Sequence, residues 1–177
     1  GQHFADRPKP DAALVAGYEA REYMLWSRQY PITPKPEYSQ LAAYFNLDNG
    51  SGKVRGIYAE GNLGVASTFR SWLAPFNAMG ADAVVASKTG GTDHVFMQAI
   101  GLPAYQFVQD PLDYDSRTHH SDVDTYDHLR ADDLRQAAVI MASFLWNAAN
   151  APEALPRGPL PTKPVVTDPF AYSDEDD

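Results

Sequence analysis

Apolar positions recur at two different spacings along the middle of the chain. Short apolar runs between turn residues predict strands, whereas apolar residues three or four apart predict helices. Strands are expected at residues 41–47, 54–58, 83–86 and 104–108. Helices are expected at residues 11–27, 63–79, 93–100 and 132–147, with Pro75 kinking the second or ending it early. Strands that alternate with helices predict parallel pairing in an α/β sheet.

The last predicted helix has the clearest start and the clearest periodicity. Asp132 or Asp133 is expected at its N-cap. The spacing places four apolar residues on one face, namely Leu134, Ala138, Met141 and Leu145.

The same patterns divide the chain into three segments. Residues 1–37 are irregular and helical, with several prolines, and their aromatic side chains either pack on the core or contact a partner or second subunit. Residues 38–150 carry the regular α/β pattern. Residues 151–177 form a Pro-rich acidic tail that is expected to be extended along the surface or disordered.

Composition narrows the classes of function. The 177 residues fit one domain, and a net charge of −9 argues against nucleic-acid binding. The longest apolar stretch, residues 137–149, is interrupted by Ser143 and Asn147 and is too short to span a bilayer, so no membrane partner is expected. The chain has no cysteine, so any metal must be bound by His and carboxylate ligands.

Three polar groups follow predicted strands: Asp48, the pair Gly90-Gly91, and His120. Ligands of α/β sheets bind outside the carboxyl ends of the strands, so a site is expected where these loops meet. Each group also has a plainer interpretation. Asp48 opens a common Asp-Asn-Gly turn, and Gly90-Gly91 can form either an anion-binding loop or a tight turn with Thr92 or Asp93 as N-cap.

The pair His119-His120 is the most specific signal for a metal site. In extended backbone, adjacent side chains point to opposite sides, so one imidazole can face a metal while the other lines the pocket or packs. Ser121 and Asp124 supply groups that can hold the loop or orient an imidazole. The alternative is a polar surface loop. A serine-hydrolase site is disfavoured, because the sequence contains no Gly-x-Ser-x-Gly.

Four blocks in order resemble the C-terminal half of the co-catalytic two-zinc exopeptidases, the family of bacterial leucyl-type aminopeptidases and glutamate carboxypeptidases. The blocks are Tyr44 to Gly50, Gly90 to His94, Phe107 to Asp110 and Thr118 to Tyr126. The resemblance implies a three-layer α/β/α fold with a mostly parallel sheet.

The resemblance also implies roles for individual residues. Asp48 and His120 would each be a ligand, to different zinc ions, and His119 would stabilise the transition state. Gly91 and Thr92 would border the pocket for a peptide substrate. The supporting residues would be Asp93, Ser121 and Asp124. The implied activity is that of a zinc aminopeptidase that releases N-terminal residues from peptides.

The sequence departs from this family in one respect. The family's remaining ligands and its general base come from an earlier segment that includes a Glu-Glu pair, and the sequence contains no Glu-Glu. We therefore expect the N-terminal part of the fold to be absent, with weak or no zinc binding and negligible activity for the 177 residues alone.

Two other functions compete with the peptidase. The first is a non-catalytic binding or assembly module derived from the same fold, which would self-associate. A complementing N-terminal segment would instead favour the enzyme. The second, less favoured, is a related acyltransferase such as a glutaminyl cyclase. Relatives are often periplasmic or secreted, which favours those compartments.

Overall fold

The computed structural model describes residues 4–6 and 31–160. The helix expected at residues 11–27 lies outside the described residues, as does the acidic end of the chain. None of the helices in the described part is long and apolar enough to cross a membrane.

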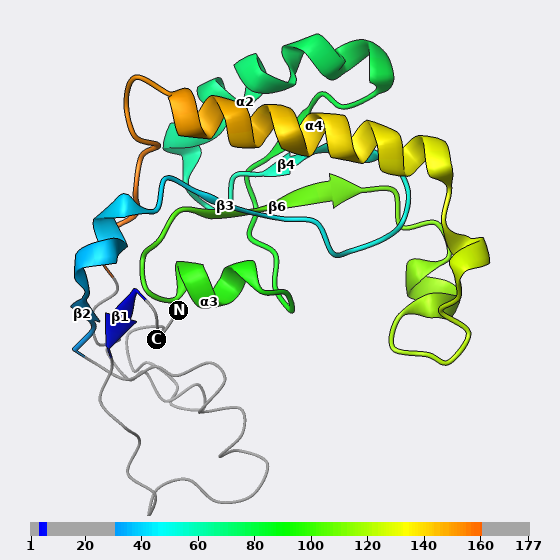
Figure 1. Ribbon diagram of the computed structural model, residues 1–177, viewed down its shortest axis with the longest axis horizontal. Helices are drawn as coiled ribbons and strands as arrows, with labels where there is room; N and C mark the ends of the chain where they lie inside the picture. The colour runs from blue at the N-terminus through cyan, green and yellow to red at the C-terminus, as the bar shows by residue number, and fades with distance from the viewer. Residues whose placement is uncertain (1–3, 7–30, 161–177) are drawn as a thin grey trace, which may run out of the picture.

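A four-stranded sheet forms the centre of the described structure (Figure 1). Its strands run in the order β3, β6, β4, β5, with bounds Tyr44–Asn46, Ala104–Gln109, Val54–Tyr58 and Ala83–Val85. The short strands β1 and β2, Ala5–Asp6 and Thr33–Pro34, pair antiparallel in a separate sheet.

Two of the three strand pairs in the main sheet are parallel, as the alternating pattern predicts. β3 pairs parallel with β6, and β4 pairs parallel with β5. The central pair β4 and β6 is antiparallel, with a register shift between Val54 and Gly56. The sheet is therefore mixed and mostly parallel. β6 lies between β3 and β4, although it follows β3 by sixty residues in the sequence.

Helices lie on both sides of this sheet (Figure 1). α2 (Ala66–Leu73) and α4 (Ala131–Asn150) lie on one side, and α3 (His94–Gln98) lies on the other. The helix predicted at 63–79 is present, but only its middle is α-helical. It starts as a 3-10 turn, Leu63–Val65, and continues after α2 as a 3-10 helix, Ala74–Met79, with Pro75 near its start. Shorter turns of helix are Pro36–Gln40, Tyr114–Thr118 and Tyr126–His128.

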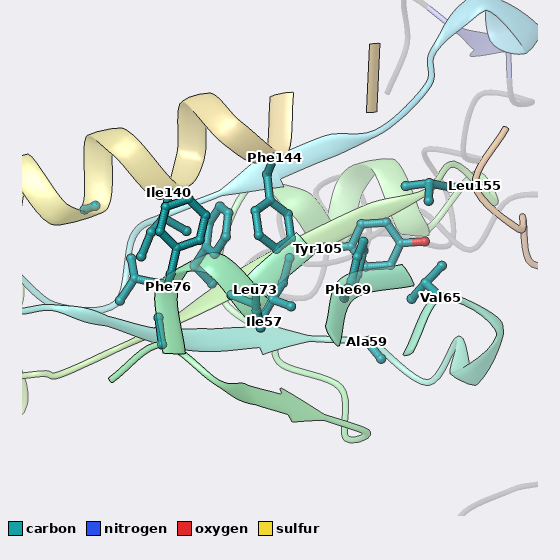
Figure 2. Close-up of a cluster of buried hydrophobic side chains, with 14 residues drawn as sticks. Ile57, Ala59, Val65, Phe69, Leu73, Phe76, Tyr105, Ile140, Phe144 and Leu155 are labelled. Atoms are coloured by element: carbon teal, nitrogen blue, oxygen red, sulfur yellow. The ribbon is translucent and has the colours of Figure 1, made fainter. Parts of the chain in front are cut away.

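The main core lies between the sheet and the pair α2 and α4 (Figure 2). The ring of Phe144, on α4, packs edge-on to Phe107 at 5.2 Å and to Phe45 at 5.6 Å. Phe69, on α2, packs edge-on to Tyr105 at 4.8 Å. Tilted and edge-on contacts of this kind add to the free energy gained from burying the rings.

The predicted N-cap of α4 was wrong, whereas the four apolar residues predicted to share one face do so, on the side that is turned away from the sheet. The N-cap position is Arg130, so Asp132 and Asp133 lie in the first turn. The helix buries Asp133, Ala137, Ile140 and Phe144, whereas Leu134, Ala138 and Leu145 are exposed. Apolar residues occupy both sides of this helix, so periodicity alone did not identify the side that meets the sheet.

The segment after α4 packs against the domain. Leu155 is 6% exposed and belongs to the main core. The guanidinium of Arg157 donates to the backbone oxygens of Tyr38, Ser39 and Leu41. Residues 151–160 thus follow the surface, as expected for an extended segment, and are anchored by one buried side chain.

Candidate active site

A cavity of about 410 Å³ lies beside the ends of β3 and β6. It brings together three residues that the sequence assigned to one site: Gly91, Thr92 and His119. Asp48 and His120 are not among its lining residues, although each is next in sequence to a residue that is. The other lining residues are Asn49, Tyr58, Gly90, Phe107, Val108, Gln109, Pro111, Tyr114 and Asp115.

The two histidines do not point to opposite sides of the loop. Their rings are stacked, with centroids 3.8 Å apart and planes 28° from parallel, and Tyr114 lies 4.6 Å from the ring of His119. The expectation failed because the backbone is not extended at His120, where φ is +57°. A left-handed residue turns its side chain back towards its neighbour, so both imidazoles lie on the same side of the loop.

Asp48 is close enough to the other loops to affect their titration. Burial raises the pKa of the Tyr114 phenol, and the charges of Asp48, Asp115 and Asp124 raise it further. Burial likewise raises the pKa of Tyr44, together with the charges of Asp93 and Asp48. The carboxylates of Asp48, Asp115 and Asp124 thus create a negative field around Tyr114, which lines the cavity. Such a field favours a cation and disfavours an anionic ligand.

Ser121 acts on the loop rather than on an imidazole. Its hydroxyl lies 2.6 Å from the backbone oxygen of Arg117 and 3.1 Å from that of Thr118. The backbone amide of Asp124 donates to the oxygen of Ser121. Of the two roles expected for Ser121, the structure therefore shows the one that holds the loop. The carboxylate of Asp124 is exposed, and its negative charge helps to raise the pKa of the Tyr114 phenol.

The loop before α3 is held by a buried network that the sequence interpretation missed. The carboxylate of Glu60 accepts from the Thr89 amide at 2.9 Å and from the Thr89 hydroxyl at 2.5 Å. Nε2 of His94 lies 3.2 Å from the same carboxylate and 3.0 Å from the Thr89 hydroxyl. The side chains of His94 and Glu60 are 0% and 2% exposed.

These contacts define where the protons lie. The Thr89 hydroxyl has one hydrogen and gives it to Glu60, so it can only accept from His94. Nε2 of His94 therefore carries a proton, and Nδ1 faces the Thr92 hydroxyl at 2.5 Å. Burial alone would raise the pKa of the Glu60 carboxyl, but the hydrogen bonds from His94, Thr89 and Gln98 together hold it below its usual value.

Asp93 is the N-cap residue of α3, one of the two candidates expected, but neither it nor Thr92 caps the helix through its side chain. Asp93 has helical dihedral angles and makes no side-chain capping bond. The Thr92 hydroxyl faces His94 instead. Gly91 has φ of +79°, a conformation that favours glycine, and its α-carbon faces open space. The loop therefore presents its backbone at Gly91 to the cavity. The side-chain contacts among Thr92, His94, Thr89 and Glu60 hold it in place.

The zinc site implied by the sequence is incomplete within the described residues. Zinc in proteins takes three or four side-chain ligands. Among residues 4–6 and 31–160, no group of three His, Asp or Glu side chains is placed to hold a metal ion. Asp48 and His120 supply suitable ligand atoms but do not converge with a third such residue. The described residues alone do not fit a two-zinc site.

Glu60 was missed although a usable signal was present. It follows the buried strand β4, just as Asp48 follows β3, and a carboxylate at such a position needs a partner. His94 was noted only as part of a block. The sequence does not show that Glu60 and His94 are partners, because they are 34 residues apart and meet only in the folded chain.

Comparison with known proteins identifies the family. The sequence pattern of peptidase family M28 matches residues 7–145. Among solved structures, the chain is similar to a peptidase M28 precursor from Shewanella amazonensis, with 29% identity and a TM-score of 0.55. The alignment covers 68% of this chain and 27% of the precursor, so the chain spans about a quarter of that protein's length. A comparison with the curated proteins gave no match. The chain belongs to peptidase family M28.

Proposed function

We propose that this chain supplies one part of the active site of a zinc-dependent aminopeptidase, which releases N-terminal residues from peptides. The observation that carries the proposal is the cavity at the ends of β3 and β6. Gly91, Thr92 and His119 line this cavity together, and they come from the sequence blocks that resemble the metallo-exopeptidases. The chain also belongs to family M28. M28 peptidases generally use zinc, and the carboxylate and imidazole of Asp48 and His120 are suitable ligand types.

Each named residue has a part in this proposal. The Gly90-Gly91 backbone and Thr92 border the peptide, and the exposed carboxylates around Tyr114 attract its positively charged N-terminus. His119 lines the cavity and can donate to the oxyanion that develops on the scissile carbonyl. Asp93, Ser121 and Asp124 support the loops. When bound, zinc would polarise the carbonyl and activate water.

We further propose that the 177 residues have negligible peptidase activity alone. The support is that no three metal ligands converge in the described part of the chain. The test uses an aminoacyl-nitroanilide substrate with zinc present. The chain is assayed alone and after addition of a segment that carries the family's Glu-Glu pair. We expect hydrolysis only in the second case, abolished by Asp48→Ala and unchanged by Asp82→Ala, which alters an exposed carboxylate outside the cavity lining.

A non-catalytic binding or assembly module is the second candidate, favoured by the exposed apolar face of α4. The same assay separates the two functions. If the complemented protein binds zinc and still does not hydrolyse the substrate, the aminopeptidase proposal is wrong and the module remains. A periplasmic or secreted location is proposed on family resemblance only.

A further inference from the structure

The outward side of α4 is apolar along its whole length. With 3.6 residues per turn, nine of its exposed residues fall within an arc of roughly 140°, and the exposed Asp132 and Asn150 lie just outside one edge of that arc. Leu134, Val139, Leu145 and Trp146 are 43%, 53%, 52% and 71% exposed. Four exposed alanines share this arc, Ala131, Ala138, Ala142 and Ala149. Arg135 is the one charged residue of α4 inside this arc. We name this set of nine residues the α4 face.

Such a face is unusual for a helix that borders solvent. Surface helices normally turn a polar side outwards, and a helix that is apolar all round is normally covered on all sides. The buried side of α4 is already occupied by the core residues Ala137, Ile140 and Phe144. Contiguous exposed apolar surface of this kind marks an interaction site.

We propose that the α4 face is the interface of a homodimer in which two copies of α4 pack antiparallel, with the two-fold axis at Ala142. This proposal does not depend on the proposed peptidase activity. The reason for choosing a second copy is that the face is complementary to itself, in size and in charge, when one copy is reversed.

The size complementarity follows from the order of large and small residues. Reversal about Ala142 sets Ala142 against the partner's Ala142, where small side chains let the helices approach closely. Trp146 then lies level with the partner's Ala138, and Leu134 lies level with the last turn of the partner, near Ala149. Trp146 and Leu134 thus each meet a small residue, while Val139 lies level with the partner's Leu145 and forms an apolar pair with it. A parallel pair would instead set Trp146 against Trp146 and Leu134 against Leu134.

The charge complementarity concerns the two ends of the helix. The first turn of α4 carries Asp132 and Asp133, whereas its last turn has no basic residue to stabilise the partial negative charge of the helix C-terminus. In the antiparallel pair, Arg135 lies beside the last turn of the partner and supplies that positive charge. Its present partner, Asp132, lies at 2.5 Å, but both side chains are mostly exposed, and such pairs are weak.

The first test measures the association state by sedimentation equilibrium. We expect the wild-type chain to be dimeric and Leu145→Glu to raise the dimer dissociation constant at least about tenfold, because an unpaired carboxylate is disfavoured in an apolar interface. Leu63→Glu is the matched control, because Leu63 is 65% exposed and lies outside the α4 face. A monomeric wild-type chain, or equal effects of the two variants, would overturn the proposal.

The second test fixes the geometry and uses the absence of native cysteine. Ala142→Cys places two thiols at the axis, within reach of a disulfide, whereas Ala149→Cys places them at opposite ends of the interface. With copper–phenanthroline as oxidant, we expect a covalent dimer from Ala142→Cys and little from Ala149→Cys. If both variants gave a covalent dimer, the contact would be parallel or random. If neither variant gave one, another partner would cover the α4 face. Both results would contradict the antiparallel homodimer.

Discussion

Glu60 has a left-handed backbone conformation, with φ of 54°, where the chain leaves β4. Non-glycine residues rarely adopt it, and here the side chain explains why it is retained. From this position the carboxylate reaches Thr89, which precedes the loop residues that line the cavity, and His94, the first residue of α3. The Glu60 carboxylate is buried, and its hydrogen bonds join the loop residue Thr89 to His94 and Gln98 of α3.

Replacement of Glu60 by Gln should destabilise the chain by about 1–3 kcal/mol at neutral pH, because the Thr89 amide and hydroxyl then face a weaker acceptor. Urea unfolding measures the loss. Glu37→Gln, at an exposed position, is the matched control and should have little effect. A loss for Glu60→Gln no larger than for the control would show that the network contributes nothing to stability.

The pH dependence of that difference has a defined sign. The pKa of Glu60 is lowered from 4.5 in the folded chain, so its stabilisation is fully present above pH 4.5 and is lost as the pH falls through the folded pKa. The difference in unfolding free energy between wild type and Glu60→Gln should therefore narrow below pH 4.5. A difference that widened there would contradict the assignment.

The metal-ligand candidates were predictable from the sequence, but their arrangement was not. The position of Asp48 after a strand and the doubled histidine are local patterns, and Gly91, Thr92 and His119 do line one cavity. The stacking of His119 on His120 depends on a single left-handed residue, which no periodicity reveals. The partnership of Glu60 with His94 depends on how β4 and α3 pack.

Among the elements, β4 and β5 approach each other unusually closely at Gly56. A β-carbon added there would lie 2.0 Å from the backbone oxygen of Ala83. This clash is with backbone, so it cannot be relieved by a rotamer change. Gly56→Ala should therefore lower the free energy of unfolding by about 3 kcal/mol or more.

Chemical denaturation measures this effect. The matched control is Gly158→Ala, because no atom outside the chain neighbours lies within 4 Å of a β-carbon added at Gly158. The control should be close to neutral. Equal stabilities of the two variants would mean that β4 and β5 can separate at little cost.

A second prediction for the elements concerns how α4 is attached to the sheet. Phe144 is 0% exposed and packs against Phe45, Phe107 and Trp72. Phe144→Ala should cost about 3–5 kcal/mol, since the truncated side chain leaves a cavity among rings that cannot collapse. Leu63→Ala, at an exposed apolar position, should cost far less. Thermal unfolding of both variants checks the contrast.

Most elements of the fold were predictable, because short apolar runs and helical spacing are local signals. The strand β4 was predicted with its observed bounds, and Pro75 marks the change from α-helix to 3-10 helix. The antiparallel pairing of β4 with β6 was not predictable from alternation. Which side of α4 is exposed could not be read from the pattern either, since Leu134 and Leu145 are as apolar as the buried Ile140 and Phe144.

For the whole molecule, the described residues offer zinc only part of a ligand set. We expect calorimetric titration of the isolated chain to give a zinc affinity weaker than micromolar, unchanged by Asp48→Ala or His120→Ala. Surface carboxylates can bind zinc loosely, so the two variants serve as the control for site-specific binding. Micromolar affinity that either variant abolishes would show that the chain completes a site by itself.

The place of β6 in the sheet has a consequence for the order of folding. β3 pairs with β6, and Tyr44 lies opposite Ala104, so this part of the sheet cannot close until a loop of sixty residues has formed. During synthesis, β3 and β4 emerge from the ribosome well before the strand that separates them. Contacts so distant in sequence slow folding. Until they form, an unpaired β3 is open to association with other chains.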